Sequence, residues 1–592
     1  MRALWTWNIR LSPPPHNIPM CCQVLSSNLR STLRSSFSQF QRASNSFAFI
    51  STHSIPRPTP THQTRRRQHN YFHQLSTTRD SQYEDFFRYT SGRWVWDEEQ
   101  QLLDRYRRFN VPELQRVAAT SVGAKECVSM RKLAEGSFNK VFRLIMDNGS
   151  VVIARIPNPN AGPSYYTTAS EVATMDFART ILEIPVPEVY AWSASVSNPV
   201  GAEYIIMEEV VGRQAADSWN TMELEDKVSI MKELISIEKR LLSVSFSCFG
   251  NIHYASDNVE GSIAAKIVGD VSIDVQNIVS TRFTIGPTVE REFWSKERSK
   301  LDIDRGPWKD PHDYISAIAL REIAWIKQYA IPTVSNDPLK PSAAQNSPSE
   351  HLSLLGKYLD LAPYLLPTDP DLLTANLWHK DLHSGNIFIE KNRITSIIDW
   401  QGTWAGPLFI QARHPKLINY DGEIILKLPE NYKHLKEEEK IPIKEQVASS
   451  ILLHLYENFT GKENPRLSRV FRTEHGRTRG EVISFCGNTW DDDILPFRES
   501  LVRMERYWDE LGFNIPCPIH FTEDELRSHL DDAEGWNEVQ DFWDSVAGIV
   551  DRDGWTPCDK YEDAVALFSE LRQTGLKVMN GQDRNRFEKQ TR

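Results

Sequence analysis

A short stretch in the second half of the chain places acidic and amide side chains at close spacing. Asn386 follows Asp381 by five residues, and two apolar runs, 387–389 and 394–398, then lead to Asp399. The polar residues between the runs predict a hairpin, in which the residue before the first strand lies near the residue after the second. We therefore expect Asn386 and Asp399 to meet. An amide oxygen with a carboxylate suits Mg²⁺ held together with substrate phosphates.

Asp381 stands at the other end of the same loop. A carboxylate in this place can accept a proton from an attacking hydroxyl group, which is general-base chemistry. His379 and His383 flank it on either side. We expect these histidines to brace the loop through hydrogen bonds, and acid–base roles for them are the alternative.

A second pair of charged residues lies much earlier in the chain. Alternating residues over 151–156 predict a strand that carries Arg155, and residues 166–182 predict a helix ended by the prolines that follow it. Glu171 heads the apolar stripe of this helix. Burying a carboxylate without a cation is costly, so Arg155 is its expected partner. Alternatively, Glu171 lies at the edge of the stripe and reaches water.

The elements around these residues change in character along the chain. Short strands and tight turns, including the hairpin signal Asp147-Asn148-Gly149, dominate residues 126–210, and helical periodicity dominates from Thr221 onward. This order predicts an α+β fold, with a small antiparallel-sheet lobe that holds one helix and a larger, mostly helical lobe. A cleft between two such lobes is a usual place for a ligand.

The length and the changes in composition suggest several segments. We divide the chain into a targeting or disordered segment, a helical extension, the strand-rich N-lobe, the helical C-lobe with the loop of Asp381, and an acidic helical C-terminal extension. Their predicted bounds are 1–79, 80–125, 126–210, 211–430 and 431–592.

The first 79 residues differ sharply from the rest. They contain ten Arg and twelve Ser but no Lys, Asp or Glu, which is the composition of a mitochondrial transit peptide. A disordered basic tail is the alternative reading. The seven cysteines show no CxxC pair or disulfide framework, which fits a reducing compartment such as the mitochondrial matrix.

Charge limits the classes of partner. After residue 79 the chain holds 58 basic and 79 acidic residues, a net charge of about −21. This balance argues against a nucleic-acid or anionic-membrane surface, because both need a basic patch. It is mildly compatible with a cationic small substrate, although ordinary solubility charge is the better explanation. No apolar run approaches the length of a membrane-spanning helix.

The motif around Asp381 also resembles a known family. His379-x-Asp381-x-x-x-x-Asn386 with a later strand-end Asp399 resembles the catalytic loop and metal-binding aspartate of the protein-kinase-like fold. The forms HxDLHxGN and IIDW are similar to the aminoglycoside phosphotransferase and choline kinase branch. Further blocks resemble the fungal "altered inheritance of mitochondria protein 9" family, namely DFFRYTSGRW, EGSFNKVF, ARIPNPNAG, SEVATMDFAR, IPVPEVYAWS, GAEYIIME and WHKDLHSGNIFI.

The resemblance implies a protein-kinase-like fold that uses ATP and Mg²⁺. It implies that Asp381 is the catalytic base and that Asn386 and Asp399 hold Mg²⁺. Arg155, paired with Glu171, would contact the ATP phosphates.

The resemblance also implies contacts for the rest of the nucleotide. Gly136 and Ser137 would lie in the loop over the phosphates. The connector from Glu208 to Val210 would offer backbone groups to adenine.

Several positions depart from the family pattern. Arg155 stands where protein kinases have Lys, the nucleotide loop has one glycine, and Lys380 stands where the phosphotransferase branch usually has Gly. Lys380 is expected near Asp381 or the γ-phosphate. No DFG glycine or APE-ended activation segment is present, which disfavours a peptide substrate and favours a small-molecule hydroxyl acceptor.

Two functions therefore compete. The first is an ATP-dependent phosphotransferase that acts on a hydroxyl group of a small molecule in mitochondria. The second is an inactive or weakly active pseudokinase that serves as a nucleotide-binding scaffold. The departures favour the scaffold. The presence of Asp381, Asn386 and Asp399 together favours the enzyme.

Overall fold

A computed structural model describes residues 81–269, 271–332, 342–418 and 420–578, together with residues 581, 584, 585 and 588. The predicted targeting segment, 1–79, lies outside the described residues. The described chain divides into two compact units. The larger comprises residues 99–539, and the smaller combines residues 81–98 with the described residues from 540 onward.

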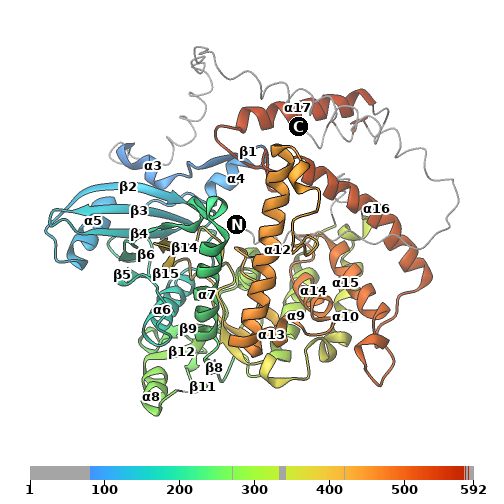
Figure 1. Cartoon of the computed structure of the whole chain (residues 1–592), viewed down its shortest axis with the longest axis horizontal. Coiled ribbons are helices and arrows are strands. Elements are labelled where there is room, and N and C mark those ends of the chain that lie inside the picture. Colours follow the sequence, from blue (N-terminus) through green and yellow to red (C-terminus); the bar gives the residue numbers. More distant parts are fainter. Residues whose placement is uncertain are drawn as a thin grey trace. The chain divides into compact units, whose positions relative to one another are not determined.

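A five-stranded antiparallel sheet forms the N-lobe of the larger unit (Figure 1). Its order is β2-β3-β4-β6-β5, with bounds β2 Cys127–Glu135, β3 Asn139–Met146, β4 Val151–Pro157, β5 Val189–Ser193 and β6 Tyr204–Glu208. Along β3 every second residue is buried, so one face of the strand packs into the core. The turn into β4 contains Gly149 at φ 84°, a conformation that glycine adopts without strain.

Helix α6 (Tyr166–Thr180) is the helix of this lobe, and most of its residues are buried. It contacts β5 and β6 of the sheet as well as β9 (Asn251–Tyr254) of the C-lobe. Helix α5 (Val111–Ser121) also packs against the sheet, through β2, β3 and β5. Asn110 caps α5 by accepting a hydrogen bond from the Glu113 amide at 3.2 Å.

The predicted hairpin is present in the C-lobe. Strands β14 (Ile387–Glu390) and β15 (Arg393–Ile397) pair antiparallel, and β7 (Arg213–Gln214) adds to the other edge of β14. Lys391 and Asn392 form the turn, both with positive φ. The residue before β7, Gly212, has φ 103°, and a Cβ there would lie 2.5 Å from the Ile389 carbonyl oxygen. Only glycine lets the connector approach the hairpin so closely.

Two further sheets complete the C-lobe. One has the order β11-β8-β13-β16, and the other has the order β10-β12-β9. Their bounds are β8 Val244–Phe246, β10 Ile263–Ala264, β11 Ile267–Gly269, β12 Phe283–Gly286, β13 Ala375–Leu377 and β16 Ala405–Pro407.

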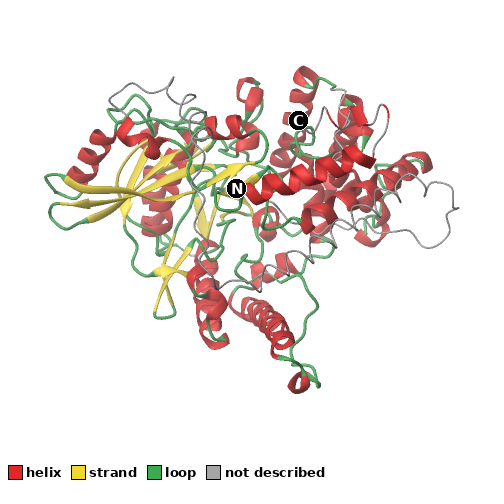
Figure 2. Cartoon of the chain, turned by 90° about the horizontal axis from the view of Figure 1, so that it is seen from above, coloured by secondary structure: helices red, strands yellow, loops and turns green. Residues whose placement is uncertain are grey.

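Helices make up most of the remaining C-lobe (Figure 2). They pair as α7 with α12, α9 with α10, and α14 with α15, and one continuous core of buried apolar residues joins them to the sheets. Their bounds are α7 Leu224–Leu241, α8 Ile273–Arg282, α9 Pro311–Tyr329, α10 Pro348–Leu365, α11 Leu408–Gln411, α12 Glu437–Glu463, α13 Pro465–Phe471, α14 Gly476–Cys486, α15 Ile494–Arg506 and α16 Glu523–Ser545.

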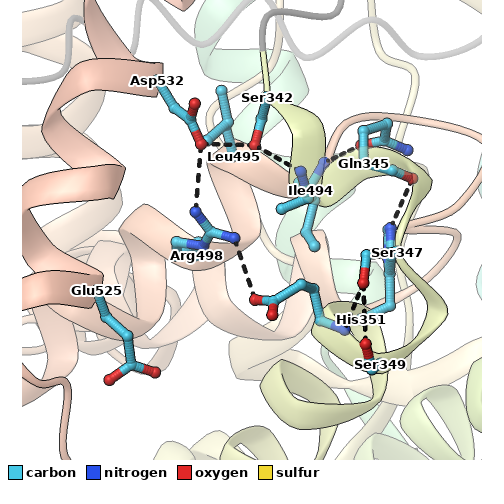
Figure 3. A network of polar contacts seen from close by, with 12 residues as sticks. Ser342, Gln345, Ser347, Ser349, His351, Ile494, Leu495, Arg498, Glu525 and Asp532 are labelled. Carbon is cyan, nitrogen blue, oxygen red and sulfur yellow. Dashed lines mark hydrogen bonds and ion pairs between the residues drawn. The ribbon is translucent and has the colours of Figure 1, made fainter. Parts of the chain in front are cut away.

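A polar network fastens the C-terminal helices of the larger unit to each other (Figure 3). Arg498 of α15 lies 3.4 Å from Asp532 of α16 and 3.6 Å from Glu350 of α10. Ser342 donates a hydrogen bond to Asp532 at 2.6 Å. The network is far from the motif residues in sequence and ties helices together, which is a structural role.

Residues 80–125 were expected to be helical, and this expectation is only partly met. The described residues of this stretch form the short helices α3 (Glu84–Phe87) and α4 (Glu98–Leu103) and the longer helix α5. They also form the strand β1 (Gly92–Trp94), which belongs to the smaller unit. β1 pairs with β17 (Trp555–Pro557), close to the other end of the chain and followed by α17 (Tyr561–Val578). Such distant pairing overrides the local pattern.

The predicted fold class is confirmed. The larger unit has a small antiparallel sheet with its helix and a larger helical lobe, which is the α+β architecture expected. Helices of membrane-spanning length and hydrophobicity are not found among the described residues.

Candidate active site

Arg155 connects the two lobes of the larger unit. The residue lies on β4 and is almost fully buried. Its Nη1 donates to Glu171 of α6, and its Nη2 donates to Asp399 Oδ1 at 2.9 Å and to Gln401 Oε1 at 2.6 Å. The expected pair with Glu171 is present, and Glu171 does not reach water. The fork of the guanidinium group makes this double connection possible.

Burial and charge act in opposite directions on this pair. Burial raises the pKa of Glu171 to about 7, against the opposing charge of Arg155. Burial disfavours the charge of Arg155, but Glu171 and Asp399 outweigh it and raise the pKa of the guanidinium group. Arg155 therefore stays charged and compensates two carboxylates at once.

Asp381 has a partner that the sequence analysis did not identify. Lys416, in the segment after α11, donates from Nζ to Asp381 Oδ1 at 2.7 Å. His383 Nε2 lies 3.6 Å from Asp381 Oδ2. Burial alone would raise the pKa of Asp381, but Lys416, with smaller contributions from His383 and His379, lowers it below the ordinary value. Asp381 is thus a carboxylate at neutral pH.

The two flanking histidines hydrogen-bond within the loop. His379 is buried, donates from Nε2 to the Ile398 carbonyl at 3.0 Å and accepts at Nδ1 from the Asp381 amide at 3.3 Å. Burial lowers the pKa of His379, so the neutral ring fits both bonds. His383 accepts at Nδ1 from the Gly385 amide at 3.0 Å. These bonds fix the backbone on both sides of Asp381.

Asn386 and Asp399 stand at facing ends of the hairpin. The Asn386 carbonyl accepts from the Ile398 amide at 3.0 Å, which places Asn386 beside the residue before Asp399. Asn386 Nδ2 donates to the Asp381 carbonyl at 3.0 Å. Asp399 adopts φ 64°, a strained conformation for a residue other than glycine, and its side chain is 41% exposed.

The donor chemistry of this pair fits Mg²⁺. No described residue donates to Oδ1 of Asn386, and one oxygen of Asp399 is left over from the contact with Arg155. Both are hard oxygen donors of the kind that Mg²⁺ takes together with phosphates and water. Among the described residues, no group of three or more His, Cys, Asp and Glu side chains is arranged to hold a metal ion. A site here would thus rely on one amide, one carboxylate and ligands from outside the protein.

Hydrogen bonds of one neighbouring side chain hold the predicted nucleotide loop. Gly136 and Ser137 lie in the turn between β2 and β3. Asn158 holds this turn, because its Nδ2 donates to the Ser137 carbonyl at 3.3 Å. Its Oδ1 accepts from the fully buried Lys140 Nζ at 2.6 Å, and burial lowers the pKa of Lys140 to about 7. Both anchors lie within the quoted blocks EGSFNKVF and ARIPNPNAG, but the sequence analysis assigned them no role, because only the fold brings their side chains together.

The connector residues differ in what they can offer. The Glu208 amide donates to the Glu188 carbonyl at 2.8 Å, so this N–H is already used at the edge of the sheet. Val210 is half-buried, and its amide has no hydrogen-bond partner among the described residues. Of these two connector residues, Val210 and not Glu208 therefore offers an amide without a partner among the described residues.

Lys380 points elsewhere than expected. Its Nζ pairs with Glu290 Oε1 at 3.2 Å and lies 5.2 Å from the ring centre of Trp404. Glu290 also accepts from the Tyr314 hydroxyl group at 3.1 Å. The cation next to Asp381 in space is Lys416, although Lys380 is its neighbour in sequence.

A small cavity lies behind Arg155 and has room for about one water molecule. Its lining includes Thr167, Thr168 and Glu171 of α6, with Asn139 and Gln401. The cavity is too small for a metabolite.

Comparison with known proteins places the chain in a family. It is 34% identical over 487 residues to a subtelomeric hrmA-associated cluster protein of Aspergillus fumigatus, covering 75% of this chain and 92% of that protein. Altered inheritance of mitochondria protein 9, mitochondrial, of Yarrowia lipolytica is 25% identical, with 83% and 88% covered. The protein of that name in Saccharomyces cerevisiae is 24% identical, with 85% and 91% covered.

The chain belongs to the family of the Aspergillus fumigatus protein. The similarity to proteins named altered inheritance of mitochondria protein 9, inferred from the sequence blocks, is confirmed and extends well beyond those blocks. No protein-family model matches the sequence.

Two solved structures are also similar to the chain. One is a thermostable mutant of aminoglycoside phosphotransferase APH(4)-Ia in ternary complex with AMP-PNP and hygromycin B. It has a TM-score of 0.32 and 14% identity and covers 68% of this chain and 100% of that one. The other is the streptomycin-ATP-APH(2")-IIa ternary complex, with a TM-score of 0.30, 11% identity and 67% and 96% covered.

Proposed function

We propose that the protein is an ATP- and Mg²⁺-dependent phosphotransferase that phosphorylates a hydroxyl group of a small molecule. The observation that carries the proposal is the double contact of Arg155 with Glu171 and Asp399. Kinases need the cation on this strand, its helical glutamate and the metal-binding aspartate in place together. Here the cation, Arg155, contacts both the glutamate and the aspartate, at the end of the hairpin that follows Asp381.

The nucleotide would lie between the two lobes. The guanidinium group of Arg155 can face the phosphates, the turn with Gly136 and Ser137 would cover them, and Val210 would meet adenine. Asn386 and Asp399 would hold Mg²⁺. The ion would neutralise charge on the phosphates as the bond to the leaving group breaks.

Asp381 would act on the acceptor. The acceptor oxygen forms a bond to the γ-phosphorus atom while the bond from that atom to ADP breaks, and the hydroxyl proton passes to the Asp381 carboxylate. The lowered pKa of Asp381 means that the side chain is an ionised carboxylate at neutral pH, the form that can take a proton. The braces from His379 and Asn386 hold the carboxylate in position.

The route of the chain after Asp399 supports a small acceptor. The segment passes within a few residues into β16 and then α11. No long activation segment intervenes to form a docking platform for a peptide. A hydroxylated metabolite fits this arrangement better than a protein substrate.

We further propose that the protein works in mitochondria. Relatives in Yarrowia lipolytica and Saccharomyces cerevisiae are named as mitochondrial proteins. The composition of residues 1–79, rich in Arg and Ser and free of acidic residues, is that of a transit peptide. Import of the full chain, but not of a chain that starts at Ser81, into isolated mitochondria would test this.

A nucleotide-binding scaffold is the second candidate. The ion pair between Lys416 and Asp381 favours it, because a base already paired with a cation is less available to a hydroxyl group. The same site would then bind ATP without transferring its phosphate.

Thermal unfolding with ATP, with and without Mg²⁺, tests the nucleotide site that both candidates share, and transfer of phosphate from ATP then distinguishes the enzyme from the scaffold. We expect ATP to raise the melting temperature, to do so more with Mg²⁺, and the Mg²⁺-dependent part to disappear in Asp399→Asn. Asp85→Asn, in the smaller unit, is a control that should respond like the wild type. Absence of any Mg²⁺-dependent stabilisation would contradict the proposed enzyme.

A further inference from the structure

The acceptor side of the site has an unusual charge arrangement. Asp381, the proposed base, is not open to a cation from solution, because Lys416 Nζ already lies 2.7 Å from its Oδ1. Of the three N–H groups of this ammonium, one is used in that bond. No other described residue pairs with it, and the Lys416 side chain is 50% exposed. The cation is therefore presented to whatever binds beside Asp381.

The backbone around Lys416 is firmly held. Leu417 and Ile418 are buried, and Arg413 donates to the Ala412 carbonyl at 2.7 Å. The ring of His414 stacks on Phe471 of α13 with centroids 4.2 Å apart. Lys416 is thus an exposed side chain in a segment whose neighbouring residues are packed into the core.

Four carboxylates near the site each pair with a cation of the protein. Glu171 and Asp399 share Arg155, Asp381 pairs with Lys416, and Glu290 pairs with Lys380. A positively charged acceptor would find no carboxylate without a partner among these groups. It would also have to approach the ammonium group of Lys416, which would repel it.

From this arrangement we infer that the acceptor carries an anionic group, such as a carboxylate or phosphate, next to the hydroxyl that is phosphorylated. The anionic group takes over Lys416 from Asp381, and this exchange releases the base to accept the hydroxyl proton. Lys416 thereby couples recognition of the acceptor to activation of the base. The inference rests on the proposed phosphotransferase function and names the class of its acceptor.

The test uses acceptors separated by charge before the reaction. A small-molecule extract of yeast mitochondria is divided by ion exchange into anionic, neutral and cationic pools. Each pool is incubated with the full-length protein, Mg²⁺ and γ-labelled ATP, and label transferred to new compounds is measured. We expect the wild type to label the anionic pool at least tenfold more than either other pool.

Variants of Lys416 then test whether this residue causes the preference for the anionic pool. Lys416→Met should lower labelling of the anionic pool at least tenfold, mainly through a higher KM for the pool. Lys416→Arg, which keeps the positive charge, should retain much of the wild-type labelling. Lys427→Met, which removes an exposed lysine of the same loop region, should match the wild type. Melting temperatures show whether each variant is folded.

The possible failures are distinguishable. Labelling of the neutral or cationic pool by the wild type, or undiminished labelling of the anionic pool by Lys416→Met, overturns the inference and leaves a phosphotransferase. Faster transfer in Lys416→Met also overturns it, because Lys416 would then be an inhibitory contact. No label in any pool overturns the phosphotransferase function itself.

Discussion

The two sides of the catalytic hairpin are built in different ways. On the nucleotide side, Arg155 and Glu171 are buried and join Asp399 in a network whose charges compensate one another. On the acceptor side, Asp381 and Lys416 form one ion pair with side chains 38% and 50% exposed. The nucleotide side is fixed by a strand and a helix in the core. The acceptor side lies on loops, where an ion pair can exchange partners at low cost.

The largest expected effect comes from breaking the buried network. Arg155→Met leaves the Glu171 carboxylate buried without a cation, and removing one partner of a buried pair costs about 3–5 kcal/mol of unfolding free energy. Denaturant unfolding of the purified protein measures this loss. ATP-dependent stabilisation should vanish as well.

The double variant Arg155→Met with Glu171→Gln is the matched control. It also lacks the cation, but it leaves no buried charge, so most of the lost unfolding free energy should return while ATP binding stays absent. If Arg155→Met is as stable as the wild type, the buried network around Arg155 does not stabilise the fold, and the contrast between the two sides is wrong.

The sequence predicted the strand, the helix and the hairpin of the proposed nucleotide side, and the reason is physical. The strand of Arg155, the helix of Glu171 and the hairpin between Asn386 and Asp399 follow from periodicities of two and 3.6 and from turn signals, which are local properties. Each of these elements is found in the structure.

The acceptor side could not be predicted in this way. Lys416 follows Asp399 by 17 residues in a segment without a motif, and only the fold brings it to Asp381. The strand β1 was missed for the same reason, because its partner β17 lies more than 450 residues away. Lys380 shows the converse, since it is adjacent to Asp381 in sequence but pairs with Glu290.

A second variant tests the buried residues that pack against the segment of Lys416. Glu238 of α7 is fully buried and accepts from the Tyr456 hydroxyl group, whose ring lies 5.6 Å from that of His414 in the segment of Lys416. Burial raises the pKa of Glu238 to about 8, against the hydrogen bond from Tyr456. The folded state therefore keeps a proton that the unfolded chain loses above about pH 4.3.

The proton on Glu238 makes the free energy of unfolding depend on pH. The contribution of Glu238 is fully present below about pH 4.3 and is lost as the pH rises through about 8, at up to about 1.4 kcal/mol per pH unit. Glu238→Gln should remove this slope. Unfolding free energies at pH 5, 6.5 and 8 measure it, and equal slopes in the two proteins would show that Glu238 does not hold the proton.

The smallest expected effect concerns the anchor of the nucleotide loop. Asn158→Ala removes the bond to Ser137 and leaves Lys140 without this acceptor. Loss of a hydrogen bond of this kind costs about 1 kcal/mol, so the KM for ATP should rise about fivefold with little change in kcat.

Asn148→Ala is a suitable comparison for that variant. Asn148 caps the turn between β3 and β4 of the same sheet, and its bonds do not reach the nucleotide loop. It should lose some stability but keep the KM for ATP. An equal rise of KM in both variants would mean that general softening of the sheet, and not the loop anchor, sets ATP affinity.

The central claim is that Asp381 accepts the hydroxyl proton during phosphoryl transfer. The most direct measurement is the rate of label transfer from γ-labelled ATP to mitochondrial metabolites by the wild type and by Asp381→Asn, with ATP affinity measured in parallel. The account predicts unchanged affinity for Mg²⁺ and ATP and a rate lowered by about 10²–10⁴. An unchanged rate in the variant would contradict it.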